Sequence, residues 1–114
     1  MLLVDRSQME QVLINLLKNA GEACAEVEHP EVIVETSFDE AKHIFRLSVR
    51  DNGCGILPEV LDKIFIPFFT TKPTGSGIGL SLCKQIMTLH GGSLQVTSEV
   101  GKGSCFVMKL WVKR

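Results

Sequence analysis

The sequence lacks the features that would most quickly assign it to a broad class of protein. It has no excess of charge of either sign, because 12 basic side chains oppose 13 acidic ones. Such a chain has no electrostatic reason to bind nucleic acid or an acidic membrane surface, although a small anion bound locally stays open. It also has no apolar run near the roughly 20 residues of a membrane-spanning helix, and no secretory signal pattern at its start. We therefore expect a soluble domain without nucleic-acid or membrane contacts.

A pattern of paired cysteines is also missing. The four cysteines are far apart and form no C-x-x-C motif; they are Cys24, Cys54, Cys83 and Cys105. This spacing is typical of free thiols in a reducing compartment, which predicts a cytoplasmic protein. At 114 residues the chain has the size of one domain, and it contains no internal repeat. Because residues 2–4 already have strand character, we expect the chain to begin within a longer protein.

Hydrophobic periodicity predicts helices over residues 6–27 and 77–90, with a short helical piece at 58–64. Asp5 is the expected N-cap of the first helix, with Gln8 at its third position. The expected apolar stripes are Met9, Leu13, Leu17, Ala20 and Cys24 on the first helix, and Leu82, Ile86 and Leu89 on the second long one.

Strand patterns account for most of the remaining sequence and come in pairs. The expected strands are 2–4, 31–38, 43–51, 93–98 and 104–112, with a tight glycine turn at 101–103. Antiparallel hairpins with helices collected on one face predict an α+β fold, a two-layer sandwich.

Alternation along the strand 43–51 places Asp51 on the core side, where a charged group is costly. One interpretation is that Asp51 only opens the turn Asp-Asn-Gly that follows. The other is that it lies in a pocket floor and accepts a hydrogen bond from a ligand amine, while Gly53 and Gly55 allow backbone to approach closely. The residues alone leave both open.

Asn15 and Asn19 lie four positions apart on the polar face of the first helix. Their amide oxygens suit Mg²⁺ when phosphates supply the other ligands, and asparagine is a poor helix former in mid-helix. A solvated helix face that carries two asparagines is the alternative.

The glycine-rich run FFTTKPTGSGIGLS, residues 68–81, is neither common nucleotide loop. Leu80 replaces the last glycine of G-x-G-x-x-G, and no G-x-x-x-x-G-K-[ST] occurs. The run does open a predicted helix, whose first N–H groups favour an anion, with Lys72 and hydroxyl side chains just upstream. A loop that only relieves crowding between helix and sheet is the alternative.

Taken in order, five segments resemble motifs of the catalytic and ATP-binding domain of bacterial two-component sensor histidine kinases, within the GHKL superfamily that includes gyrase, Hsp90 and MutL. They are QVLINLLKNAGEA (11–23, N box), DNGCGI (51–56, G1 box), IFIPFFTTK (64–72, F box), GSGIGLSL (75–82, G2 box) and GKGSCF (101–106). The resemblance covers the whole chain, 1–114, as one domain. It implies the Bergerat fold, a mixed, mostly antiparallel sheet covered on one face by helices, with an ATP lid at about 53–78.

The resemblance also implies ATP and Mg²⁺ as ligands. Asn19 would be the metal-binding asparagine, Asp51 would accept from the adenine N6 amine, and Ser104 would lie near the adenine. The lid anchors that it implies are Phe65, Phe68 and Phe69. The nucleotide-binding positions that it implies are Asn15, Asn19, Asp51, Gly53, Gly55, Ile56, Thr71, Lys72, Gly75, Ser76, Gly77, Ile78, Gly79, Leu80 and Ser104.

One position separates branches of the superfamily. Where ATP-hydrolysing relatives such as gyrase carry a glutamate that activates water, one helical turn before the metal asparagine, this chain has Asn15. An amide cannot act as a general base. We therefore expect Asn15 and Lys72 to support transfer of the γ-phosphoryl group to a nucleophile held in line, through positioning and charge neutralisation.

In the family that nucleophile is a histidine on the dimerisation domain of the same full-length kinase, and a response regulator is the next partner. This chain's own histidines, His29, His43 and His90, lack the helical context of a phospho-acceptor. We expect the isolated domain to be a monomer that binds ATP with Mg²⁺ without phosphorylating itself. The short lid and PFFTTK further resemble kinases of the nitrogen-regulation type, which are cytoplasmic or carry a PAS sensor.

The same residues disfavour three other functions. A GHKL ATPase of the gyrase or MutL type is disfavoured by Asn15 and the compact size. A serine kinase of the anti-sigma-factor type is disfavoured by the F box, which that branch usually lacks. A degenerate nucleotide-sensing or structural domain is disfavoured because every motif position is intact.

Overall fold

The computed structural model describes residues 5–67, 69 and 79–111. Its elements in chain order are α1 (Arg6–Ala23), β1 (Val32–Asp39), β2 (Ile44–Asp51), α2 (Pro58–Leu61), α3 (Gly79–Leu89), β3 (Ser93–Glu99) and β4 (Gly103–Trp111). The predicted order of helices and strands is confirmed for these residues. The expected strand at 2–4 and the predicted helix start at Gly77 lie outside them.

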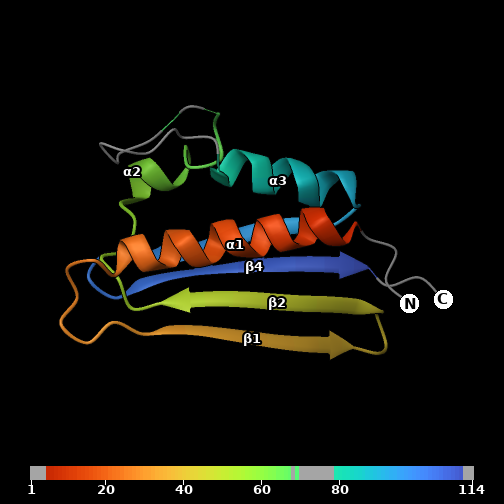
Figure 1. Ribbon diagram of the computed structural model, residues 1–114, viewed down its shortest axis with the longest axis horizontal. Coiled ribbons are helices and arrows are strands. Elements are labelled where there is room, and N and C mark those ends of the chain that lie inside the picture. Colours follow the sequence, from red (N-terminus) through yellow and green to blue (C-terminus); the bar gives the residue numbers. More distant parts are fainter. Residues whose placement is uncertain (1–4, 68, 70–78, 112–114) are drawn as a thin grey trace.

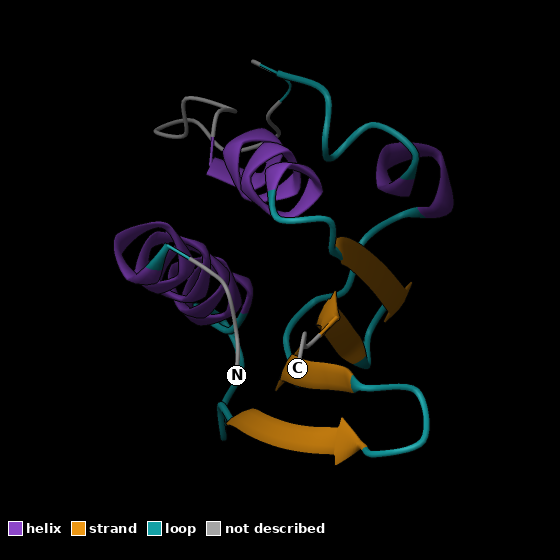
Figure 2. Ribbon diagram, turned by 90° about the vertical axis from the view of Figure 1, so that its right-hand side faces the viewer, coloured by secondary structure: helices purple, strands orange, loops and turns teal. Residues whose placement is uncertain are grey.

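The strands form one sheet in the order β1-β2-β4-β3, and each neighbouring pair is antiparallel. Figure 1 shows α1 and α3 over one face of this sheet. Figure 2 shows the two helices side by side, with neither on the opposite face. The predicted α+β two-layer sandwich is therefore confirmed, while the mixed character implied by the resemblance is not seen among the described strands.

The helix α1 begins where the sequence predicts but ends at Ala23 rather than at residue 27. The carboxylate of Asp5 accepts a hydrogen bond from the Gln8 N–H at 3.1 Å, which satisfies a free donor of the first turn. At the other end, the Ala23 carbonyl accepts the Cys54 N–H at 3.1 Å. The longer helix was a wrong prediction because the loop after β2 takes the carbonyl that Val27 would need.

The buried faces of α1 and α3 are rotated from the predicted stripes. The stripes placed Leu17 and Leu89 in the core, but these residues are 38% and 71% exposed. Each helix contacts the sheet and also the other helix, so its buried arc turns toward that second neighbour. The buried side chains of the two helices are Val12, Leu16, Ala20, Cys83, Ile86 and Met87.

Leu16→Ala should lower the free energy of unfolding by about 2–5 kcal/mol, because it leaves a cavity in the core. Leu16 is 0% exposed and belongs to the same cluster as Phe106 of β4. Ile14→Ala is the control on the same helix; Ile14 is 62% exposed, and its loss should change the stability by less than about 0.5 kcal/mol. Urea unfolding followed by circular dichroism measures both. Equal losses would contradict the packing of α1 described above.

Candidate functional site

Residues from separate sequence motifs meet at one end of the sandwich. The end of α1, the end of β2 and the start of β4 lie there, on the left in Figure 1, while α3 begins further in, beside Asn15 of α1. The antiparallel register pairs Asp51, the last residue of β2, with Ser104 near the start of β4. Strand direction and register therefore build the site from distant parts of the chain.

Asp51 is a buried carboxylate with only one of its oxygens satisfied. The residue is 4% exposed, as expected from its place on the core side of β2. Its Oδ1 accepts the Gly53 N–H at 2.9 Å, whereas Oδ2 is buried and has no hydrogen-bond partner among the residues that the structure describes. An unsatisfied buried polar atom costs about 1–3 kcal/mol and calls for an explanation such as a ligand. One oxygen thus makes the predicted turn, while the ligand contact of the other stays a prediction.

A small hydrogen-bond network supports the strand start beside Asp51. Ser98 of β3 donates to the Gly103 carbonyl at 3.0 Å and accepts the Ile56 N–H at 2.8 Å. Its Oγ also lies 2.9 Å from the Ser104 Oγ. Because the single hydroxyl proton of Ser98 is already used, Ser104 donates in this pair and keeps its acceptor lone pairs. Sequence reasoning missed Ser98, whose only signal is its cross-strand register with Ser104.

The loop after β2 is wedged between α1 and the end of β3. A Cβ at Gly53 would collide with the carbonyl of Ala23, and one at Gly55 would collide with the carbonyl of Glu99. Gly55 also has a φ of +78°, which favours glycine. Both close approaches are to carbonyls of this chain, so the approach of backbone to a ligand at Asp51 stays a prediction.

Asn52 holds the segment between α1 and β1 against the same loop. Its Oδ1 accepts the Glu31 N–H at 2.8 Å, and its Nδ2 donates to the His29 carbonyl at 2.9 Å. Sequence reasoning treated Asn52 only as a turn former, because nothing local indicates a partner more than twenty positions earlier. Asn52 supports the site through the backbone that it anchors.

Asn15 is held between α1 and α3. Its Cγ lies 3.9 Å from the Cβ position of Gly79, the first residue of α3. A hydrogen bond also joins its side chain to the thiol of Cys83. Burial raises the pKa of that thiol above its ordinary value, and the bond to Asn15 opposes the rise. Asn15 and Asn19 are both half-buried, so neither lies on a fully solvated helix face.

The predicted phosphate-binding run lies mostly outside the described residues. This holds for Thr71, Lys72, Gly75, Ser76, Gly77 and Ile78, and for the lid anchor Phe68. Leu80 and Phe65 are described and pack against the core. The Lys84 ammonium lies 5.2 Å from the centroid of the Phe65 ring and donates to the Leu94 carbonyl at 2.9 Å. Lys84 therefore joins the F box to α3 and β3 through a cation–π contact and a hydrogen bond.

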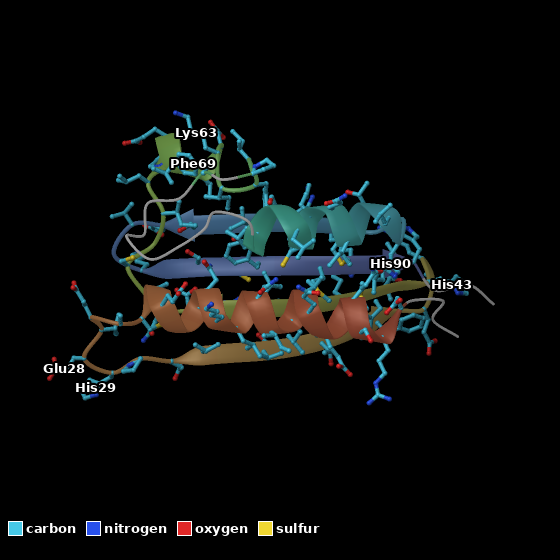
Figure 3. All side chains as sticks on the ribbon, turned by 45° about the horizontal axis from the view of Figure 1, so that its top comes forward. Glu28, His29, His43, Lys63, Phe69 and His90 are labelled. Atoms are coloured by element: carbon cyan, nitrogen blue, oxygen red, sulfur yellow. The ribbon has the colours of Figure 1, made fainter. Side chains whose placement is uncertain are left out.

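His90 makes hydrogen-bond contacts with two helices. His90 Nε2 accepts the Asp5 N–H at 3.0 Å, while its Nδ1 lies 2.8 Å from the Ile86 carbonyl. These partners assign the tautomer that donates from Nδ1, and the ring joins the start of α1 to the end of α3. Figure 3 shows His43 and His90 at one end of the molecule and Phe69 at the other. The ring of His90 therefore satisfies a carbonyl in the last turn of α3.

Residues 5–67, 69 and 79–111 contain no group of three or more His, Cys, Asp or Glu side chains able to hold a metal ion. Over the same ranges, no helix has the length and apolar character needed to span a bilayer. A nucleotide-bound Mg²⁺ needs few protein ligands, since phosphate oxygens and water supply the rest. The asparagines of α1 fit that limited requirement.

Comparison with known proteins identifies close sequence relatives. A family model described as histidine kinase-, DNA gyrase B- and HSP90-like ATPase matches residues 4–114. The chain is 40% identical over 106 residues to the sensor protein FixL of Bradyrhizobium diazoefficiens, covering 93% of this chain and 21% of that protein. It is 40% identical over 108 residues to the sensor histidine kinase ZraS of Escherichia coli, with coverages of 95% and 22%. The chain thus spans about a fifth of the length of these relatives.

Solved structures share the fold over nearly the whole chain. The catalytic domain of the histidine kinase ThkA, in a nucleotide-free form, matches with a TM-score of 0.82 at 36% identity, covering 96% of this chain and 69% of that one. The mycobacterial sensor histidine kinase MprB matches with a TM-score of 0.83 at 26% identity, with coverages of 96% and 75%.

Gly53→Ala should destabilise the domain by about 1–3 kcal/mol, because the added Cβ overlaps backbone that is held in place by the Cys54 hydrogen bond. Gly21→Ala is the matched control on α1, since no atom lies within 4 Å of its Cβ position. The control should stabilise the domain by up to about 1 kcal/mol through helix propensity. Thermal unfolding compares the two variants. An unchanged midpoint for Gly53→Ala would contradict the wedged position of the loop.

Proposed function

The chain belongs to the histidine kinase-, DNA gyrase B- and HSP90-like ATPase family as the catalytic ATP-binding domain of a sensor histidine kinase, and on this premise we propose how it binds and uses ATP. Asp51 accepts the adenine N6 amine, and Ser104 contacts the same end of the adenine, directly or through water. The γ-phosphoryl group is presented to a histidine that lies outside this chain, on a helical dimerisation domain.

The unpartnered Oδ2 of Asp51 is the observation that carries this proposal. An amine N–H directed at it forms a charge-assisted hydrogen bond and satisfies this buried carboxylate oxygen. Adenine offers an N6 amine, whereas guanine presents the O6 oxygen, an acceptor that would face the carboxylate unfavourably. The site should therefore select ATP over GTP.

Four of the five sequence motifs divide the site between them in this proposal. The N box at 11–23 lies along the phosphates, and the G1 box at 51–56 forms the adenine pocket. The F box at 64–72 anchors a lid that spans about 53–78, and the G2 box at 75–82 leads into α3. The fixed part of this arrangement is supported by the meeting of α1, β2 and β4 at one end of the sandwich, and by the position of Gly79, the first residue of α3, beside Asn15.

The phosphates are placed at the first turn of α3, whose free N–H groups and dipole favour an anion. Thr71, Lys72 and the run Gly75–Leu80 would add donors and positive charge there. The amide oxygen of Asn19 would hold Mg²⁺, which neutralises phosphate charge when it is bound. Ile56 packs partly against the core beneath the G1 box and would form the floor of the adenine pocket.

The site favours phosphoryl transfer over hydrolysis because Asn15 has no basic group to take a proton from water. In the transfer, a ring nitrogen of the incoming histidine forms a bond to the γ-phosphorus. The bond from that phosphorus to the β–γ bridging oxygen breaks, ADP leaves with the electron pair, and the ring releases its proton to solvent. Asn15 and Lys72 would position the group and neutralise its charge.

Further features of the proposal concern the longer protein and rest on resemblance. We propose that the histidine belongs to the dimerisation domain of the same kinase and that a response regulator receives the phosphoryl group next. PFFTTK and the short lid support a kinase of the nitrogen-regulation type with a PAS sensor. The catalytic domain would act in the cytoplasm, where ATP is available, and would be a monomer when isolated.

Asp51→Asn should weaken ATP binding by about 10-fold to 150-fold, because it removes a hydrogen bond to a charged acceptor and places an amide donor near the adenine amine. Asp39→Asn is the control, since Asp39 lies at the far end of the β1–β2 hairpin and its Oδ1 acceptor for Lys42 N–H is retained. Titration with a fluorescent ATP analogue and Mg²⁺, with GTP as competitor, measures both variants. Equal affinities for wild type and Asp51→Asn would contradict the adenine contact.

With γ-labelled ATP and Mg²⁺, the 114-residue chain alone should acquire no stable label, because none of its histidines is placed as an acceptor. Label should appear on a histidine-bearing helical dimerisation domain added in trans, and an acceptor with His replaced by Ala should stay unlabelled. Gel autoradiography and a phosphate-release assay follow the two fates of the γ-phosphoryl group. Phosphate release that exceeds transfer would instead support an ATPase.

A further inference from the structure

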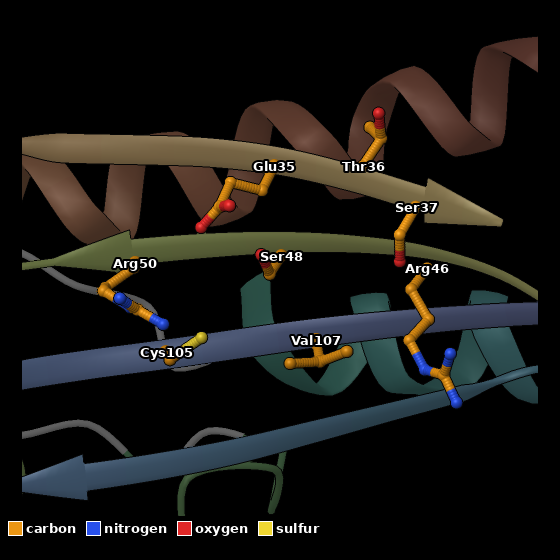
Figure 4. Close-up of a pocket in the computed structure, with 8 residues that line it drawn as sticks. All are labelled: Glu35, Thr36, Ser37, Arg46, Ser48, Arg50, Cys105 and Val107. Carbon is orange, nitrogen blue, oxygen red and sulfur yellow. The ribbon is translucent and has the colours of Figure 1, made fainter.

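The sheet face that carries neither α1 nor α3 holds a row of basic side chains that the proposed ATP site does not use. Strand alternation turns Arg46, Ser48 and Arg50 of β2 toward this face. A cavity of about 300 Å³ lies among them and is also lined by Glu35 and Val107. Figure 4 shows Arg50, Ser48 and Arg46 in a row along β2, with Glu35 on β1 and Val107 on β4 to either side.

Two positive charges stand directly opposite each other on the central strands. In the register of β2 with β4, Arg46 pairs with Lys109. The neighbours of this pair on the outer strands are Ser37 and Ser93, which carry no charge. Directly opposed side chains have Cβ atoms about 4.5–5.5 Å apart, and like charges in this arrangement are destabilising. The central strands therefore carry a repulsion that an anionic group would relieve.

No carboxylate of the described residues relieves this repulsion. Glu35 pairs with Ser48, which is two residues along β2 from Arg46, so Glu35 lies diagonal to Arg46 and not opposite it. Within residues 5–67, 69 and 79–111, no ion pair or side-chain hydrogen bond is formed by Arg46, Arg50 or Lys109. Three cations without partners on adjacent central strands form a positive surface that matches a negatively charged one.

The spacing of the cations favours a polypeptide over a single small anion. The α-carbons of Arg46 and Arg50 are four positions apart on an extended strand, about 13 Å. Side chains of a strand stand roughly perpendicular to the sheet, so the two guanidinium groups are suited to two separate anionic groups. Val107 presents an apolar surface between them. Trp111, which is 50% exposed, extends the row beyond Lys109. Arginine and tryptophan are enriched among the residues that contribute most to protein–protein binding.

We propose that Arg46, Arg50, Val107, Lys109 and Trp111, here called the basic face, bind an acidic polypeptide segment of another domain or protein. One carboxylate of the segment lies between Arg46 and Lys109, a second lies at Arg50, and a small apolar side chain contacts Val107. A polynucleotide fits less well, because the net charge of the chain is −1 and supplies no long-range attraction for a polyanion.

Fluorescence of Trp111 reports binding at the basic face, because it is the only tryptophan in the chain. The probe is a capped peptide of repeated Glu-Ser-Ala-Ser, which places glutamates four positions apart, and the control peptide has Gln in place of Glu. The Glu peptide should shift the emission saturably. Its affinity should decrease as the NaCl concentration is raised from about 50 to about 300 mM. The Gln peptide should leave the emission unchanged.

Arg46→Gln combined with Lys109→Gln should weaken the peptide affinity about threefold to thirtyfold, as expected for two exposed charge pairs. Arg6→Gln combined with Lys102→Gln is the matched control, since it removes equal charge from α1 and the β3–β4 turn and should leave the affinity unchanged. Lys109→Gln alone should raise the melting temperature at low salt, because it removes the repulsion with Arg46.

The proposal is overturned if the Glu peptide leaves Trp111 emission unchanged, or if both double variants lose affinity equally. It is also overturned if a single-stranded oligonucleotide or phosphatidylserine vesicles shift the emission at lower concentration than the peptide does. A lower melting temperature for Lys109→Gln at low salt would contradict the repulsion between Arg46 and Lys109 on which the proposal rests.

Discussion

The burial of one carboxylate, that of Asp51, sets the conditions for the rest of this end of the molecule. A charge removed from water is costly unless hydrogen-bond donors meet it, and the protein supplies one, the N–H of Gly53. This arrangement depends on β2 running straight into a loop wedged against Ala23, and on β4 starting beside it. The close glycine contacts and the Ser98 network therefore hold in place a group that the fold itself leaves half satisfied.

Features that depend on nearby residues could be predicted from the sequence. The Asp5 cap, the hairpins and the inward position of Asp51 follow from local patterns, and the structure has all three. Ser98 could not be found in this way, because its role depends on the register between β3 and β4. Leu17 was misplaced because α1 turns its buried arc toward α3, a neighbour that lies more than sixty positions away and leaves no mark on local periodicity.

The two faces of β2 are linked through its register. The alternation that turns Asp51 toward the helices turns Arg50 away from them, so a shift of one residue would exchange the two faces. Burial of Val49 and the pairing of Asp51 with Ser104 fix that register. The repulsion between Arg46 and Lys109 is thus retained by a strand alignment that the core and the nucleotide site both require.

Asn15 determines that the proposed site has no general base for the activation of water. The first turn of α3 and the Cys83 thiol both lie against its side chain, so the amide is fixed close to where the phosphates are placed. A carboxylate at this position would bring negative charge toward the phosphates, and it would also provide the base that water needs. An amide does neither, so in the proposed site bound ATP would meet no water activated from this helix. The fate of the γ-phosphoryl group would then depend on the nucleophile that a partner brings to it.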